Sequence, residues 1–112
     1  MTVLEKTLSP GDTAELMRQA RQASDLMKAL SHETRLVILC LLSEGEKSVS
    51  ELEDILDMPQ ASVSQQLARL RFDRLVKTRR DGRTIYYSIA DSGVSTIIGA
   101  LHQMYCGVRE KA

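Results

Sequence analysis

Apolar residues recur at intervals of three and four positions over five stretches of the chain, which predicts a mainly helical protein. The first helix is expected to begin at Asp12, with Asp12 or Thr13 as its N-cap, and to end near Leu30. Ser31 is the expected N-cap of the second helix, which ends before Gly45. Because this second stretch is apolar on every side, we expect it to be buried.

Two shorter helices joined by a tight turn are predicted next. Ser48 and Ser50 are each followed three positions later by a glutamate, the pattern of a capping box, so the third helix begins between them. Residues 57–59 form the turn, and the fourth helix extends from Gln60 to Phe72. The buried face of this fourth helix is expected to consist of Val63, Leu67 and Leu70.

A small β-hairpin and a last helix complete the predicted fold. Residues 76–80 and 84–89 are rich in β-forming side chains, and the Asp-Gly-Arg sequence at 81–83 between them is typical of a hairpin turn. Asp91 or Ser92 is expected to cap the last helix. The apolar face of that helix is formed by Val94, Ile97, Ile98, Leu101 and Tyr105.

The length of 112 residues corresponds to one domain. We expect a flexible N-terminal arm over 1–11, a folded domain over 12–106 and a C-terminal tail over 107–112, with the last helix ending near Gly107. No apolar stretch reaches about 18 residues, and no export signal is visible. With only two cysteines, the sequence predicts a cytoplasmic protein with reduced thiols and no membrane contact.

The charge is balanced overall but strongly polarised along the chain. The 15 basic residues match the 15 acidic ones in number. Residues 69–83 nevertheless carry seven basic side chains against two acidic ones, whereas residues 44–57 carry six acidic side chains against one basic one. The positive segment includes the predicted hairpin, and a basic surface of this kind attracts phosphates.

The order of the elements indicates a DNA-binding protein. Two short helices joined by a turn form a helix-turn-helix, whose second helix enters the major groove of DNA. Glutamine pairs with adenine there, and serine contacts bases or phosphates. The residues expected to contact double-stranded DNA are Gln60, Ser62, Ser64 and Gln65 on the fourth helix and Arg79, Arg80 and Arg83 on the hairpin.

Residues 48–89, SVSELEDILDMPQASVSQQLARLRFDRLVKTRRDGRTIYYSI, resemble the winged helix-turn-helix of the ArsR family of bacterial repressors. Residues 29–36, ALSHETRL, resemble the opening of the second helix in that family, and the likeness extends over roughly 13–106. The resemblance implies a homodimer built through the first and last helices. It also implies repression by binding an inverted-repeat operator and release by a small inducer.

Many members of this family sense metals, but the matching positions here lack the ligands. One family site uses a Cys-Val-Cys sequence, and this chain has Ser48-Val49-Ser50 there. Serine is a poor replacement for a thiolate as the ligand of a soft metal. A second site lies on the last helix, where Asp91 matches one ligand and the other positions hold Gly93, Met104 and Gly107. We therefore expect no metal and no other cofactor.

The two cysteines resemble those of the sulfide- and persulfide-responsive branch of the family. There, cysteines at the positions of Cys40 and Cys106 link the second and last helices when reactive sulfur species or oxidants bridge them. The thiolate is the reactive form, and His102 lies one helical turn before Cys106, where it would lower the pKa of that thiol. Cys106 is thus the expected first attacker and Cys40 the resolving partner.

Three alternatives stay open. The same fold could sense a metal or haem through Cys40, Cys106 and His102. A thiol-dependent oxidoreductase is disfavoured because the chain has no Cys-x-x-Cys pair and no nucleophile–histidine–acid set. A protein-binding module with no DNA role would lack the steep salt dependence of duplex binding. The sequence therefore favours a regulator and not an enzyme.

Overall fold

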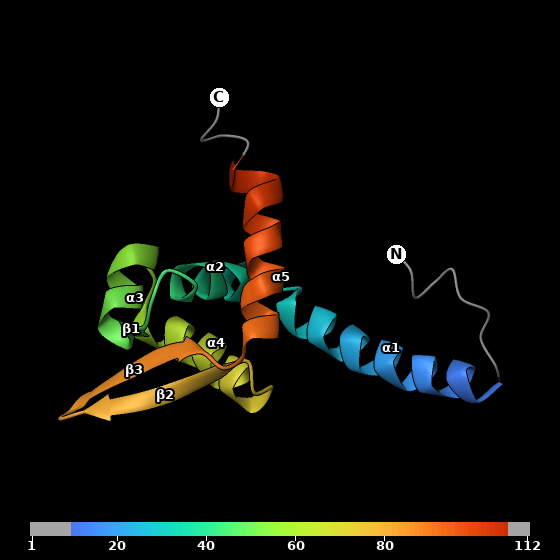
Figure 1. Ribbon diagram of the computed structural model, residues 1–112. Helices are drawn as coiled ribbons and strands as arrows, with labels where there is room; N and C mark the ends of the chain where they lie inside the picture. The colour runs from blue at the N-terminus through green and yellow to red at the C-terminus, as the bar shows by residue number, and fades with distance from the viewer. Residues whose placement is uncertain (1–9, 108–112) are drawn as a thin grey trace.

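The computed structural model describes residues 10–107, which form a helical body with a small sheet on one side (Figure 1). The mainly helical fold with a β-hairpin is as predicted. The elements in chain order are α1 (Pro10–Leu30), α2 (Glu33–Leu42), β1 (Lys47–Ser48), α3 (Val49–Leu56), α4 (Gln60–Phe72), β2 (Val76–Asp81), β3 (Thr84–Ile89), α5 (Ser92–His102) and the π-helical turn η2 (Gln103–Gly107).

Local capping fixes where α3 begins and ends. Ser48 Oγ accepts a hydrogen bond from the Glu51 N–H at 3.2 Å, and Glu51 Oε1 accepts one from the Ser48 N–H at 2.8 Å, which completes the predicted capping box. Asp57 ends α3 in the left-handed conformation, with φ of 53°. The predicted bounds of α4 are confirmed.

The sheet is antiparallel, with the strands in the order β1-β3-β2. Asp81 pairs with Thr84, so the predicted hairpin closes through two residues, and Gly82 takes a positive φ of 64° that costs glycine no steric strain. The short strand β1 was not predicted. Its two residues pair with Tyr87 and Tyr86 of β3 and attach the hairpin to the start of α3.

Two predicted helix starts are wrong. The first helix begins at Pro10, so Asp12 and Thr13 lie inside it and part of the expected arm is helical. Proline suits a first helical position because its φ is already helical and no N–H partner is needed there. The N-cap of α2 is His32, whose Nδ1 accepts from the Thr34 N–H at 3.2 Å, whereas the Ser31 hydroxyl donates to the Lys28 carbonyl.

The C-terminal part of the last helix also differs from the prediction. Asp91 is its N-cap, as expected, and its Oδ1 accepts from the Val94 N–H at 3.0 Å. The α-helix ends at His102, however, and the chain continues as the π-helical turn η2 to Gly107. The rest of the expected arm, 1–9, and most of the expected tail, 108–112, lie outside the described residues.

One hydrophobic core joins α2, α3, α4 and α5. The side chains with no exposed surface in this core are Ile38, Leu39, Leu52, Val63, Leu67, Leu70 and Ile98. The predicted buried face of α4 is thereby confirmed. The expectation that α2 is buried on every side is wrong, because Val37 is 44% exposed.

The two outer helices leave much apolar surface uncovered. In α1, only Ala29 and Leu30 near the C-terminal end are buried, and most of the helix projects away from the body (Figure 1). Exposed apolar side chains include Met17 and Met27 on α1 and Met104 and Tyr105 on η2. Among the described residues, no helix combines the length and apolar content that a membrane span requires.

Candidate DNA interface and thiol site

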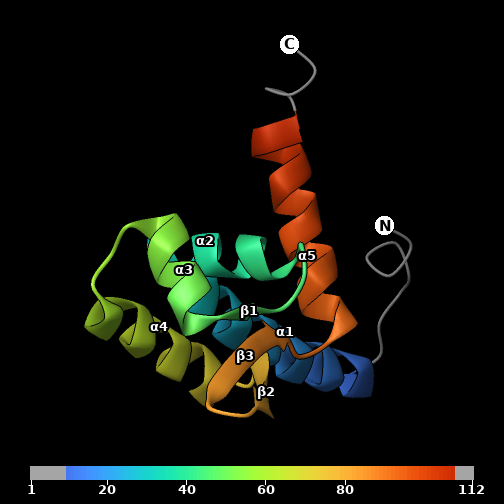
Figure 2. The ribbon, with the colours of Figure 1, turned by 90° about the vertical axis from the view of Figure 1, so that its left-hand side faces the viewer.

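The core determines which face of α4 points outward. Val63, Leu67 and Leu70 are all fully buried, and with 3.6 residues per turn the opposite face must point to solvent. That outward face is formed by Ala61, Gln65, Ala68 and Phe72, which are all exposed. The helix and the hairpin lie on the same side of the molecule, away from the end toward which α5 projects (Figures 1 and 2).

The four residues predicted on α4 do not share this outward face equally. Gln65 lies at its centre and Ser64 is exposed on one edge, whereas Gln60, the first residue of α4, is exposed on the side nearer the buried positions. Ser62 is half-buried on the opposite edge. The predicted contacts do not include Ala61, Ala68 and Phe72, although the spacing from the buried positions already places them opposite the core. The exposed residues Arg69 and Arg71 were noted only as part of the basic segment.

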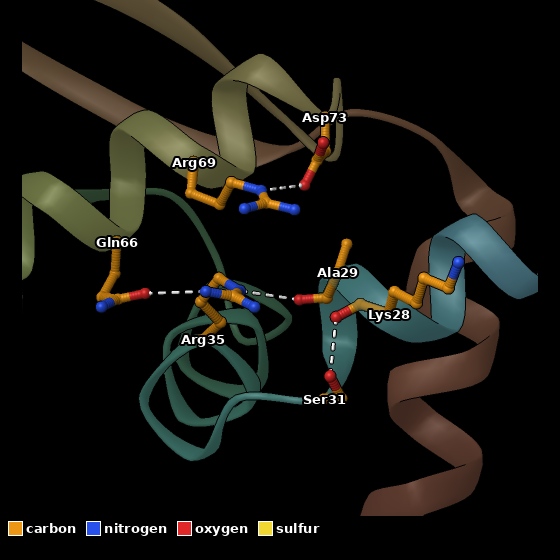
Figure 3. Close-up of polar contacts among 7 residues, drawn as sticks. All are labelled: Lys28, Ala29, Ser31, Arg35, Gln66, Arg69 and Asp73. Atoms are coloured by element: carbon orange, nitrogen blue, oxygen red, sulfur yellow. Dashed lines mark hydrogen bonds and ion pairs between the residues drawn. The ribbon is translucent and has the colours of Figure 1, made fainter.

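Arg35 of α2 holds α4 in position (Figure 3). Its Nε donates to the carbonyl of Ala29, at the end of α1, at 2.7 Å, and its Nη1 donates to Gln66 Oε1 of α4 at 3.1 Å. A hydrogen bond from a charged donor is stronger than one between neutral groups. One half-buried guanidinium thus joins three helices, while Arg69 bonds Asp73 at the far end of α4 at 2.8 Å.

The three predicted arginines of the hairpin have different surroundings. Arg80 and Arg83 are exposed near the turn, with side chains available to phosphates. Arg79 is already engaged, because its Nε donates to Glu46 Oε2 at 3.1 Å and its Nη2 donates to Glu46 Oε1. Its guanidinium also lies 4.7 Å from the ring centroid of Tyr86. Glu46 was not predicted to take part.

This ion pair shifts the pKa values of both partners. The hydrogen bond from Arg79, together with its positive charge, lowers the pKa of Glu46 below the ordinary range of a glutamate. The same contact raises the pKa of Arg79. A carboxyl group with a lowered pKa stabilises the fold above its ordinary titration range, and that contribution is lost as the pH falls through the lowered pKa. At neutral pH the pair therefore attaches strand β2 to the loop before β1.

We expect the Glu46 carboxyl to titrate below the usual glutamate range in the unmodified protein and to return to that range in Arg79→Gln. NMR titration of the side-chain carboxyl carbon measures both values. Arg80→Gln is the matched control, because it removes a neighbouring charge without touching the pair, and it should leave the Glu46 pKa low. An ordinary Glu46 pKa in the unmodified protein would show that the pair does not form in solution.

The thiol residues are only partly described. Cys40 is half-buried on α2, where it packs against the core, and α2 in turn packs against α5. The side chain of Cys106 lies outside the described residues, so the predicted pairing of the two thiols stays a prediction. His102 is exposed at the end of α5. Residues 103–107 continue beyond it as the π-helical turn η2, and the predicted action of His102 on the Cys106 thiol stays a prediction.

The positions that match the family's metal sites have structural roles here. Ser48 is buried as the N-cap of α3, and Asp91 caps α5. Among the side chains that the structure describes, no three histidine, cysteine or acidic groups gather in a way that would hold a metal ion. Capping accounts for both side chains without a ligand.

Comparison with known proteins decides the family. Residues 32–78 match the family described as bacterial regulatory protein, arsR family. The transcriptional activator HlyU of Vibrio cholerae is 40% identical over 98 residues, which cover 88% of this chain and 91% of that protein. The biofilm growth-associated repressor of Agrobacterium fabrum is 39% identical over 111 residues, covering 97% and 95%. This chain belongs to the bacterial ArsR family.

Solved structures of ArsR-family relatives share the winged helix-turn-helix fold. Reduced HlyU from Vibrio cholerae superposes with a TM-score of 0.79 at 41% identity and covers 82% of this chain and 97% of its own. The repressor BigR from Xylella fastidiosa gives 0.77 at 36% identity, covering 84% and 96%. The chain is therefore a DNA-binding regulator of transcription and not an enzyme, as predicted.

Proposed function

We propose that this ArsR-family regulator is a homodimeric repressor that senses reactive sulfur species or oxidants. Bridging of Cys40 and Cys106 would release it from an inverted-repeat operator. The observation that carries the proposal is the position of Cys40 on the same helix as Arg35, which is bonded to Gln66 of the recognition helix α4. Because its target is chromosomal DNA, we place the protein in the cytoplasm.

The exposed apolar side chains of the outer helices support the homodimer. Met17 and Met27 on α1 and Met104 and Tyr105 beyond α5 are each more than half exposed, and a second copy would cover them. A two-fold dimer presents two copies of α4 to successive major grooves, about 34–36 Å apart. An operator with two inverted half-sites matches that symmetry.

The proposed bridge forms by ordinary thiol exchange. A thiolate attacks the outer sulfur of glutathione persulfide, which leaves a protein persulfide and releases glutathione. The second thiolate then attacks the inner sulfur of the protein persulfide, forming the disulfide and releasing hydrogen sulfide. The dithiol is oxidised and the persulfide is reduced. Attack on a longer polysulfide leaves additional sulfur atoms in the bridge.

The bridge would act on α4 through α2. Joining Cys40 to Cys106 ties α2 to η2, the turn that follows α5, and any shift of α2 moves Arg35 relative to Ala29 and Gln66. A differential free energy of about 1–3 kcal/mol between the two arrangements is enough to change DNA affinity 5- to 150-fold. The similar HlyU structure is that of reduced HlyU. For this chain, we propose that the redox state of the two thiols controls DNA binding.

We expect glutathione persulfide to lower the mass of the reduced protein by about 2 Da, or to raise it by about 30 Da for one inserted sulfur. Operator affinity should fall by about tenfold or more. Intact-mass spectrometry and fluorescence anisotropy on the same samples measure both. Cys40→Ser and Cys106→Ser should keep their DNA affinity after treatment. Alkylation rates of these two variants test whether Cys106 reacts first.

Unchanged mass and affinity after treatment would contradict the thiol mechanism. The reduced protein would then be tested for stoichiometric binding of zinc or haem, which is the signature of the alternative sensor that uses Cys40, Cys106 and His102. A mass change without a loss of affinity would show that the thiols react but do not control DNA binding. Turnover of a disulfide substrate would instead indicate an oxidoreductase.

A further inference from the structure

We propose that the recognition helix α4 reads the methyl groups of thymine through an apolar stripe. The stripe consists of Ala61, Ala68 and Phe72. This inference rests on the proposed function, because it requires α4 to enter the major groove of an operator. It goes further by naming the chemical group that the helix recognises and the side chains that recognise it.

The stripe lies at the centre of the outward face of α4. The three residues follow one another at seven and four positions, so they share one side of the helix, opposite the buried Val63, Leu67 and Leu70. Phe72 is 83% exposed, the largest exposed fraction among the exposed large apolar side chains in the described part of the chain. An aromatic ring this exposed indicates a partner surface.

The stripe is separate from the apolar surface of the outer helices. Met17 and Met27 lie on α1, and Met104 and Tyr105 lie beyond α5, whereas Phe72 is the last residue of α4. Helix α4 and the hairpin lie on the same side of the molecule (Figure 2). A dimer formed through the outer helices therefore leaves the stripe uncovered. A partner that covers the stripe must therefore approach the side of the molecule formed by α4 and the hairpin.

Charge selects duplex DNA as that occupant. Arg69 and Arg71 are exposed and, by helical spacing, flank the stripe on its two sides. Arg80 and Arg83 are exposed on the hairpin, which lies on the same side of the molecule as α4 (Figure 1). Guanidinium groups on both sides of an apolar strip match the two phosphate backbones that border a groove. Arg69 already bonds Asp73, but a purely apolar protein partner would leave Arg71, Arg80 and Arg83 without counterparts.

The chemistry of the major groove then selects thymine. The thymine 5-methyl is the apolar group that base pairs present in that groove, and alanine and phenylalanine are side chains that contact it. Ala61 and Phe72 are eleven residues apart, about 16 Å along a helix, which spans four to five base steps of about 3.4 Å. Gln65, on the same face, is placed to bond the adenine of a neighbouring A·T pair.

The test compares thymine with deoxyuridine, which lacks only the methyl group. The probe is the duplex that the reduced protein selects from a library of random DNA, made once with thymine and once with deoxyuridine at every thymine position. Each methyl group that is covered contributes about fourfold in affinity. With at least one such group in each half-site, we expect a loss of about tenfold or more on substitution.

Protein variants assign this effect to the stripe. Phe72→Ser and Ala68→Ser should each bind the thymine duplex more weakly and show a smaller ratio of thymine to deoxyuridine affinity. Ile55→Ser is the matched control, because Ile55 is 52% exposed on α3 and lies off the stripe. That variant should retain the full ratio.

Equal affinity for the two duplexes would overturn the inference while leaving the proposed function intact, because a selected operator would still exist. An unchanged ratio in Phe72→Ser, together with a changed molecular mass in solution, would also overturn it and would identify the stripe as a protein interface. Failure to select any duplex would instead remove the proposed function, and this inference with it.

Discussion

Replacement of Arg80 and Arg83 together by alanine is expected to weaken operator binding by more than about tenfold at moderate salt. Both side chains are exposed near the turn of the hairpin, which lies on the same side of the molecule as α4 (Figure 1). Each phosphate contact contributes about 0.9 to the slope of log affinity against log salt concentration. A dimer loses four contacts, so the slope should become shallower by about 3.6.

Arg18 and Arg21 provide the matched control for this charge change. Both are exposed on α1, on the side of the helix opposite Leu16, Ala20 and Met27. Their double alanine variant removes the same charge but lies away from the hairpin, and its salt slope should stay close to that of the unmodified protein. Equal slopes for the two double variants would show that the hairpin arginines do not contact phosphates.

Leu67→Ala is expected to lower the free energy of unfolding by about 2–5 kcal/mol. Leu67 has no exposed surface and lies on the inner face of α4, so its truncation leaves a cavity under the recognition helix. Total stabilities of domains are about 5–15 kcal/mol, so this loss is a large part of the whole. Urea unfolding at fixed protein concentration measures it, since dimer stability depends on concentration.

Ile55→Ala removes a similar aliphatic side chain from a site that is 52% exposed on α3. We expect Ile55→Ala to lower the free energy of unfolding by less than about 1 kcal/mol, because the side chain that is removed is already half exposed and buries little apolar surface. If the two variants lowered the free energy of unfolding by the same amount, Leu67 would not contribute the buried contacts that the structure gives it.

Several parts of the fold that local signals determine were predicted correctly, although the starts of α1 and α2 were not. The capping box at Ser48, the bounds of α4 and the cap at Asp91 depend on residues within a few positions of one another. The Asp-Gly sequence likewise selects a tight hairpin without distant contacts. Strand β1 was missed because its two residues become a strand only through pairing with β3, about forty positions later in the chain.

The distinction between local signals and contacts between distant residues applies to the functional site as well. The basic hairpin and the serine- and glutamine-rich helix are visible in the sequence, and they predict a DNA interface there. The contacts of Arg35 with Gln66 and of Arg79 with Glu46 join residues 31 and 33 positions apart, so no local pattern indicates them. The outward position of Phe72 was available from helical spacing, but polar residues were favoured as DNA contacts over apolar ones.

Selection of duplexes from random DNA by the reduced protein tests the central claim most directly. A dimer that reads DNA through α4 should enrich sites with two inverted half-sites, their centres about 10 base pairs or a multiple of that distance apart. Sequencing of the bound fraction measures both the repeat and the spacing. Enrichment of a single unrepeated site, or of no sequence at all, would contradict the proposal of a dimeric operator-binding repressor.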